Sequence, residues 1–168
     1  PASMKPSQPM ACRGCAAKLP AQPLTAALKQ VGLGGLAEDA SLLGGEPPRL
    51  QSIDGFPALL SDPWLNGRIT ALHACSDLWA CGAAVTSAMT VVTLPMAEPL
   101  TQQELLSQTL DGIQTVLKEQ GARLIGGHTL EARSAAPAPM SLGLQVCLSV
   151  NGSSRNPWPR PRPRPRPR

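Results

Sequence analysis

The stretch from Gln51 to Gly82 reads QSIDGFPALLSDPWLNGRITALHACSDLWACG, and we expect the rest of the chain to be organised around it. Its first part predicts a strand over Leu50–Phe56, which carries the acid Asp54 near its end. A turn that contains proline follows, and a long helix over Pro63–Cys81 then carries a second acid, Asp77, near its end. Two acids on two rigid elements joined by a short loop can form a site for a metal ion and a nucleotide.

Local signals mark both ends of this helix. Ser61 or Asp62 can cap the first turn, and a proline suits the first helical position. Gly82 suits the end of the helix. We expect the helix to turn inward an apolar stripe made of Leu65, Ile69, Leu72 and Trp79.

The sequence predicts four further strands and two further helices. The strands are expected at Leu36–Leu43, Ser87–Leu94, Arg123–Thr129 and Met140–Val150. The helices are expected at Leu24–Val31 and Thr101–Gln120, the second with its leucines, Ile113 and Val116 facing inward. This order predicts an α+β fold with the helices on one face of the sheet. A second subunit or domain is expected to cover the other face.

The composition indicates one domain with two unlike ends. Residues 1–10 and 153–168 are expected to be disordered, and residues 11–152 to form the domain. Six of the 15 basic residues lie in Arg155–Arg168, so residues 1–154 carry a net charge of −2 and no specific nucleic-acid surface is expected. The alternating Pro-Arg tail is interpreted as a tag or an out-of-frame end, or as a weak binder of anionic surfaces. The absence of a long apolar run predicts no membrane span, and reduced cysteines fit the cytoplasm.

The segment CRGCAAK, from Cys12 to Lys18, leaves three interpretations open. A zinc site would need about four ligands, and no second cysteine pair or paired histidine follows. A reactive thiolate is the second interpretation, because Arg13 and Lys18 would lower the pKa of a neighbouring thiol. Inert cysteines in a loop are the third.

Three acids, Asp39, Asp54 and Asp77, lie beside apolar runs, where an acid needs a partner or a cation. Mg²⁺ takes oxygen ligands and usually shares them with phosphates. Helix capping or solvation is the alternative, and it suits Asp77 poorly because the helix around it is apolar. Asp77 also lies one helical turn after His73, on the same face.

A glycine turn is expected where the strand Arg123–Thr129 ends. Gly126 and Gly127 would expose backbone N–H groups there, beside His128 and the Thr129 hydroxyl. Such a turn can hold a phosphate, although a plain tight turn is the commoner use of two glycines.

Joined in order, these pieces resemble one enzyme family. The set CRGCAAK, EDASLL, SIDGF, DPWLNGRITALHACSDLWACGA and LIGGHTLEA is similar to the amino-terminal half of selenophosphate synthetase (selenide, water dikinase). That half is shared with aminoimidazole ribonucleotide synthetase, and the variant fused to a flavin-type oxidoreductase is resembled most closely. The similarity runs from Cys12 to Val150.

The resemblance implies a fold and a reaction. The fold would be an ATP-binding α+β domain whose four-stranded mixed sheet pairs with that of a second copy, so that a homodimer closes a barrel. The reaction would convert selenide, ATP and water to selenophosphate, AMP and phosphate with Mg²⁺, and a sulfur analogue such as sulfide is the alternative substrate.

The resemblance also implies roles for particular residues. The catalytic residues would be Cys15 and Lys18, the lysine also binding ATP and neutralising phosphoryl charge. The ligands of Mg²⁺ would be Asp39 and Asp77. The nucleotide would further contact Asp54 and Asp77, and its phosphates would be lined by Gly126, Gly127 and Thr129.

The chain departs from the family in ways that set the alternatives. Near Gly152 it passes into the Pro-Arg tail, where the family continues into a second half, so we expect a truncated or interrupted protein. His73 stands where many members have Asn, and the segment around Cys15 holds a single glycine. The alternatives are an enzyme completed by a partner and a non-catalytic dimerising fragment that binds nucleotide. A thiamine-phosphate kinase or a hydrogenase-maturation protein is disfavoured, because those lack the Cys-x-x-Lys start.

Overall fold

The computed structural model describes residues 21–33, 39–132 and 143–157. Several predictions made from the sequence lie outside these residues: the disordered end at residues 1–10, the segment Cys12–Lys18, the beginnings of two strands at Leu36 and Met140, and most of the tail. Within the described ranges, no helix is both long enough and apolar enough to cross a membrane.

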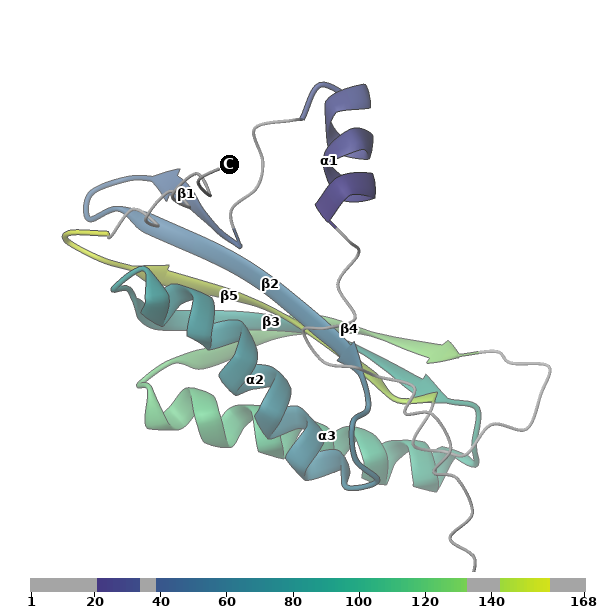
Figure 1. The fold of residues 1–168 in the computed structure, drawn as a ribbon. Coiled ribbons are helices and arrows are strands. Elements are labelled where there is room, and N and C mark those ends of the chain that lie inside the picture. The colour runs from purple at the N-terminus through teal and green to yellow at the C-terminus, as the bar shows by residue number, and fades with distance from the viewer. Residues whose placement is uncertain (1–20, 34–38, 133–142, 158–168) are drawn as a thin grey trace, which may run out of the picture.

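Three helices and five strands make up the described part of the chain (Figure 1). In chain order they are α1 (Ala21–Gln30), β1 (Ala40–Gly44), β2 (Arg49–Pro57), α2 (Pro63–Ala80), β3 (Ala84–Pro95), α3 (Pro99–Glu119), β4 (Arg123–Ala132) and β5 (Gln145–Ser153). The strands form one mixed sheet in the order β1-β2-β5-β3-β4, in which β3 and β4 are parallel and the other neighbours antiparallel. The predicted α+β class is confirmed.

The four strands that the family resemblance implied for the sheet are one too few, whereas the strand patterns in the sequence predicted all five. β1 is the additional strand, because Ala40 and Leu42 pair with Ser52 and Leu50 of β2. This pairing places the start of β1 beside the middle of β2, and Asp39 directly precedes it.

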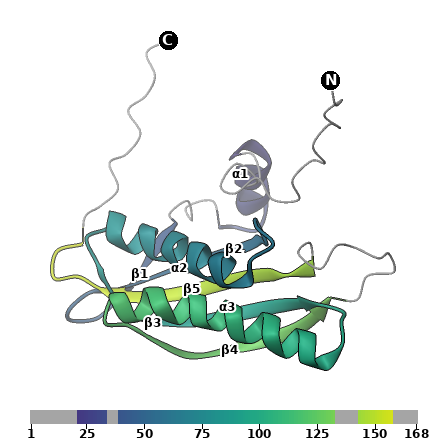
Figure 2. The same cartoon turned by 90° about the horizontal axis from the view of Figure 1, so that it is seen from below.

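The core lies between the sheet and the pair α2 and α3, which run side by side over one face (Figure 2). β5 overlaps the strand predicted at Met140–Val150 and confirms it, and its Val146, Leu148 and Val150 alternate inward, each at most 1% exposed. On α3, Ile113 and Val116 are fully buried, which also confirms the predicted inward face. Each fully buried side chain of this size stabilises the fold by about 1.5–3 kcal/mol.

α2 buries a different face from the predicted apolar stripe. Leu65, Leu72 and Trp79 remain 37%, 37% and 38% exposed, so the prediction that they point inward is wrong. The buried positions are mostly small or polar: Asn66, Gly67, Thr70, Ala71, Ala74, Cys75 and Leu78. Small residues are needed because α2 crosses α3 closely, and a Cβ at Gly67 would collide with the Thr109 carbonyl oxygen.

Both predicted ends of α2 are confirmed. The Asp62 carboxylate accepts a hydrogen bond of 3.0 Å from the Leu65 backbone N–H, which is the expected N-cap contact. At the other end Gly82 has φ 69°, and the Ala83 N–H donates to the Leu78 carbonyl at 2.9 Å. This is the Schellman arrangement, in which glycine supplies the left-handed residue.

The predicted glycine turn in the segment from Gly126 to Thr129 does not form. β4 continues through these residues to Ala132 and pairs in parallel with β3. Gly127 is needed for this close pairing, because a Cβ there would collide with the Thr90 carbonyl oxygen. The two glycines therefore serve strand packing, which their sequence alone does not distinguish from a turn.

The other face of the sheet is apolar and bears no packed helix within the described residues. Ile53, Met89, Val91 and Leu130 are 65%, 49%, 38% and 48% exposed. α1 lies on this side of the sheet in Figures 1 and 2, but none of its residues is buried. An apolar face of this kind is typical of an interaction surface.

Candidate functional site

The candidate site lies where β2 passes under α2. Alternation along β2 turns Ser52 and Asp54 toward the helix, while Gln51 and Ile53 are exposed. From α2, His73 and Asp77 meet them, one helical turn apart. The prediction that His73 and Asp77 share a face is confirmed, and that face contacts the strand that carries Asp54.

Asp54 and His73 form a close polar pair. Asp54 Oδ2 lies 2.8 Å from His73 Nδ1, and the two side chains are 10% and 30% exposed. An ionised carboxylate can only accept hydrogen bonds, so Nδ1 is the donor. The Phe56 ring meets the imidazole edge to face, with centroids 4.8 Å apart and an interplanar angle of 77°. Two residues of β2 therefore fix the His73 ring.

The Ser52 side chain contacts both Asp77 and the backbone of Asp39. Its hydroxyl oxygen lies 2.9 Å from Asp77 Oδ2 and 2.9 Å from the backbone carbonyl oxygen of Asp39. Asp77 Oδ2 and the Asp39 carbonyl oxygen are therefore at most 5.8 Å apart. Ser52 is 3% exposed, so the contact is sheltered from water. The start of β1 and the C-terminal part of α2 meet at this hydroxyl.

The acidic side chains at this site provide carboxylate oxygens, which are the ligands that Mg²⁺ prefers. In the part of the chain that the structure describes, no group of three or more His, Cys, Asp or Glu side chains could hold a metal ion alone. Mg²⁺ usually binds one or two carboxylates and completes its shell with water and phosphates. Asp77 offers one such carboxylate beside Ser52, and Asp39 reaches this point through its backbone carbonyl oxygen, so the fit is to a site that a phosphate ligand completes.

Gly126, Gly127 and Thr129 lie at the opposite edge of the sheet. β5 and β3 separate β4 from β2, which at about 4.8 Å per strand puts about 14 Å between them. The three residues line a hollow of about 420 Å³ against α3. Within one chain, the structure does not bring them together with Asp54 and Asp77.

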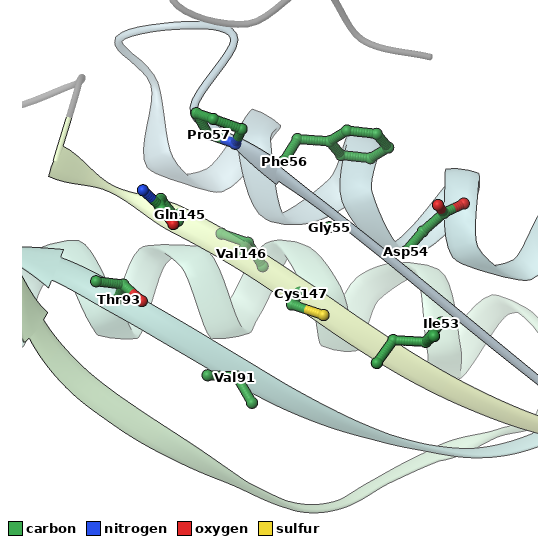
Figure 3. A pocket seen from close by; sticks show the side chains of 10 residues that line it. All are labelled: Ile53, Asp54, Gly55, Phe56, Pro57, Val91, Thr93, Gln145, Val146 and Cys147. Atoms are coloured by element: carbon green, nitrogen blue, oxygen red, sulfur yellow. The ribbon is translucent and has the colours of Figure 1, made fainter. Parts of the chain in front are cut away.

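A second hollow, of about 470 Å³, lies on the open face of the sheet across β2, β5 and β3. Figure 3 shows Ile53, Val91 and Cys147 from these three strands, with Asp54 and Phe56 extending past β2 on its other side. Burial first, and then the charge of Asp54, raise the pKa of the Cys147 thiol. A thiol with a raised pKa is a poor nucleophile at neutral pH.

Cys75 is also unsuited to nucleophilic chemistry, because burial raises the pKa of its thiol to about 11.

The predicted catalytic residues Cys15 and Lys18 lie outside the described residues. Ser52 was not predicted from the sequence as a site residue, and His73 was predicted only to share a helix face with Asp77. The period-2 alternation of β2 would have placed Ser52 on the same face as Asp54.

Residues 37–147 match the family described as AIR synthase related protein, N-terminal domain. The chain belongs to this family. Its curated relatives include the selenide, water dikinases of Bdellovibrio bacteriovorus, 32% identical over 130 residues, and of Pelobacter propionicus, 36% identical over 129 residues. Each alignment covers 70% of this chain, and 37% and 36% of the relatives, so the chain spans about a third of their length. The resemblance to the amino-terminal half of selenophosphate synthetase is confirmed.

Solved structures share the fold at low sequence identity. Thiamine monophosphate kinase from Aquifex aeolicus superposes with a TM-score of 0.65 and 13% identity, over 80% of this chain and 43% of that one. The hydrogenase maturation protein HypE in complex with ATP superposes with a TM-score of 0.52 and 17% identity, over 71% and 34%. The domain therefore has a fold that is found in several kinds of protein, one of which was solved with ATP.

Proposed function

We propose that this chain is the ATP- and Mg²⁺-binding part of a selenide, water dikinase, acting in the phosphoryl transfer that makes selenophosphate. The observation that supports this most directly is the contact of Ser52 with both the Asp77 carboxylate and the Asp39 backbone, which brings the chain segments of the two expected Mg²⁺ ligands together. The selenide, water dikinase relatives and the ATP complex of HypE support the same proposal.

In this proposal, each residue has a limited task. Asp39 and Asp77 would hold Mg²⁺, which supplies charge neutralisation at the phosphates when bound. Asp54 would contact the nucleotide and its metal ion from β2. Lys18 would neutralise phosphoryl charge, and Cys15 would be the catalytic cysteine that acts on selenide. Phosphoryl transfer requires mainly positioning and charge neutralisation, and these residue types supply both.

We further propose that the protein acts as a homodimer whose two open sheet faces close into a barrel. The exposed apolar side chains of Ile53, Met89, Val91 and Leu130 support this arrangement. A two-fold axis along the barrel would place β4 of one copy beside the β1-β2 edge of the other. Gly126, Gly127 and Thr129 of one copy could then contact the phosphates of a nucleotide that binds with Mg²⁺ beside Asp54 and Asp77 of the second.

Binding of ATP in the presence of Mg²⁺, measured by isothermal titration calorimetry, tests the proposal. We expect the unaltered chain to bind, and Asp77→Asn to weaken binding at least about tenfold. Asp111→Asn is the matched control, because Asp111 is an exposed acid that accepts a hydrogen bond from Trp64 Nε1. If the unaltered chain does not bind ATP with Mg²⁺, the proposal is wrong.

A second candidate function is nucleotide binding without catalysis, which the fold shared with HypE in complex with ATP supports. Adding selenide or sulfide to ATP and Mg²⁺ and measuring AMP separates the two. Formation of AMP that is abolished by Cys15→Ser supports the enzyme, and binding of ATP without formation of AMP supports nucleotide binding alone.

We also propose a cytoplasmic setting, which the free thiols of Cys75, Cys81 and Cys147 support among the described residues.

A further inference from the structure

The direction of the Asp54 carboxylate depends on what contacts it. β2 fixes the Asp54 backbone by pairing it with Leu148 of β5. The carboxylate can still rotate about two side-chain torsions, so the backbone alone does not aim its oxygens. The hydrogen bond of 2.8 Å from His73 Nδ1 to Oδ2 removes this freedom.

His73 is itself held in a way that makes it a suitable support. Its backbone lies within α2, which packs on β2. Its ring is held by two contacts: the hydrogen bond to Asp54 and the edge-to-face packing with Phe56, which lies on the same face of β2 as Asp54. The side chain is 30% exposed, against 10% for that of Asp54, so the pair lies at the margin of the core where a ligand can approach.

We propose that His73 is a positioning residue, which orients the Asp54 carboxylate for binding of ATP with Mg²⁺. This inference rests on the proposed function. Hydrogen bonds to a carboxylate that binds a metal–nucleotide complex keep its oxygens directed, and losing such a bond typically costs about tenfold to hundredfold in affinity. His73 acts through Asp54 and needs no contact with the nucleotide.

Two substitutions separate the hydrogen bond from the ring packing. His73→Asn places an amide N–H at the same number of bonds from Cβ as Nδ1, so it keeps the donor and loses the ring. His73→Phe keeps a ring for Phe56 and loses the donor. Leu72→Ala, at the neighbouring exposed position of α2, is the control for general effects on the helix.

The measurement is the dissociation constant of ATP by calorimetry, once with Mg²⁺ and once with EDTA, on variants whose folding is checked by circular dichroism. We expect His73→Phe to weaken binding with Mg²⁺ about tenfold or more. We expect His73→Asn and Leu72→Ala to stay within about threefold of the unaltered chain, and weak binding in EDTA to be the same in all four proteins.

The outcomes are distinct. If the unaltered chain binds ATP with Mg²⁺ and His73→Phe binds equally well, the inference is wrong and the proposed function stands. If His73→Asn weakens binding as much as His73→Phe, keeping the donor does not keep the affinity, which also contradicts the inference. If the unaltered chain fails to bind, the proposed function is wrong and the inference is wrong with it.

Discussion

Gly67 of α2 lies against the carbonyl oxygen of Thr109 on α3 so closely that no side chain fits between them. Gly112 of α3 meets the Trp64 carbonyl oxygen in the same way. The two helices thus approach through a pair of glycines, and this crossing sets how α2 lies over β2. The positions of His73 and Asp77 above Asp54 and Ser52 depend on it.

We predict that Gly67→Ala destabilises the domain by about 1–3 kcal/mol, because the added methyl group forces the helices apart. An alanine in an unconstrained helix interior would instead stabilise by about 1 kcal/mol. The free energy of unfolding by urea measures the difference. Gly126→Ala is the control, because a Cβ there meets only the flexible end of Met89, at 3.5 Å. Unchanged or increased stability of Gly67→Ala would contradict the close crossing.

The same crossing explains where prediction from the sequence failed. α3 follows the ordinary rule, since apolar residues recur at helical spacing on its inner face, where Ile113, Val116 and Leu117 are buried. In α2 the close approach selects Gly, Ala and Thr for the buried face, and these residues give little hydropathy signal. Leu65, Leu72 and Trp79 give a strong signal but lie outward.

The candidate site was predictable only in its local parts. The spacing of His73 and Asp77 placed both on one face of a helix, and the chain order put Asp54 on the preceding strand. The strand order β1-β2-β5-β3-β4 cannot be read from local patterns, because β5 enters the sheet between β2 and β3 from the end of the chain. The distance between Asp54 and Gly127 follows from that order alone.

We predict that Ser52→Ala destabilises the domain by about 1–3 kcal/mol, since Asp77 and the Asp39 carbonyl lose a sheltered donor. Ser149→Ala is the matched control on the neighbouring strand, where the hydroxyl accepts an exposed hydrogen bond from Gln51. Its effect should stay within about 0.5 kcal/mol. Urea unfolding of both variants measures this, and equal stabilities would show that the Ser52 hydroxyl contributes nothing.

We predict that the protein sediments as a dimer and that Ile53→Lys shifts it toward monomer, raising the dissociation constant about tenfold or more. Ile53 is 65% exposed at the open face, and a lysine there would have to be desolvated in the closed barrel. Leu72→Lys places the same charge on the outer face of α2 and should leave the dimer intact. Sedimentation equilibrium distinguishes these results, and a monomeric unaltered chain would exclude the barrel.

The last prediction concerns the reactivity of two thiols toward iodoacetamide. Only the thiolate reacts, so a raised pKa slows alkylation at neutral pH and the rate climbs as the pH increases. Cys147 lies half-buried on the open face and its pKa is raised by burial and by Asp54, so we expect slow alkylation that accelerates with pH. Asp54→Asn removes the negative charge, which lowers the pKa of Cys147 and should speed its alkylation at pH 7.5.

Cys75 is fully buried, with its pKa raised to about 11, and should stay unmodified in the folded protein, which makes it the internal control. Mass spectrometry of tryptic peptides assigns the label to each cysteine. A Cys147 rate that does not change in Asp54→Asn would show that the carboxylate does not act on this thiol.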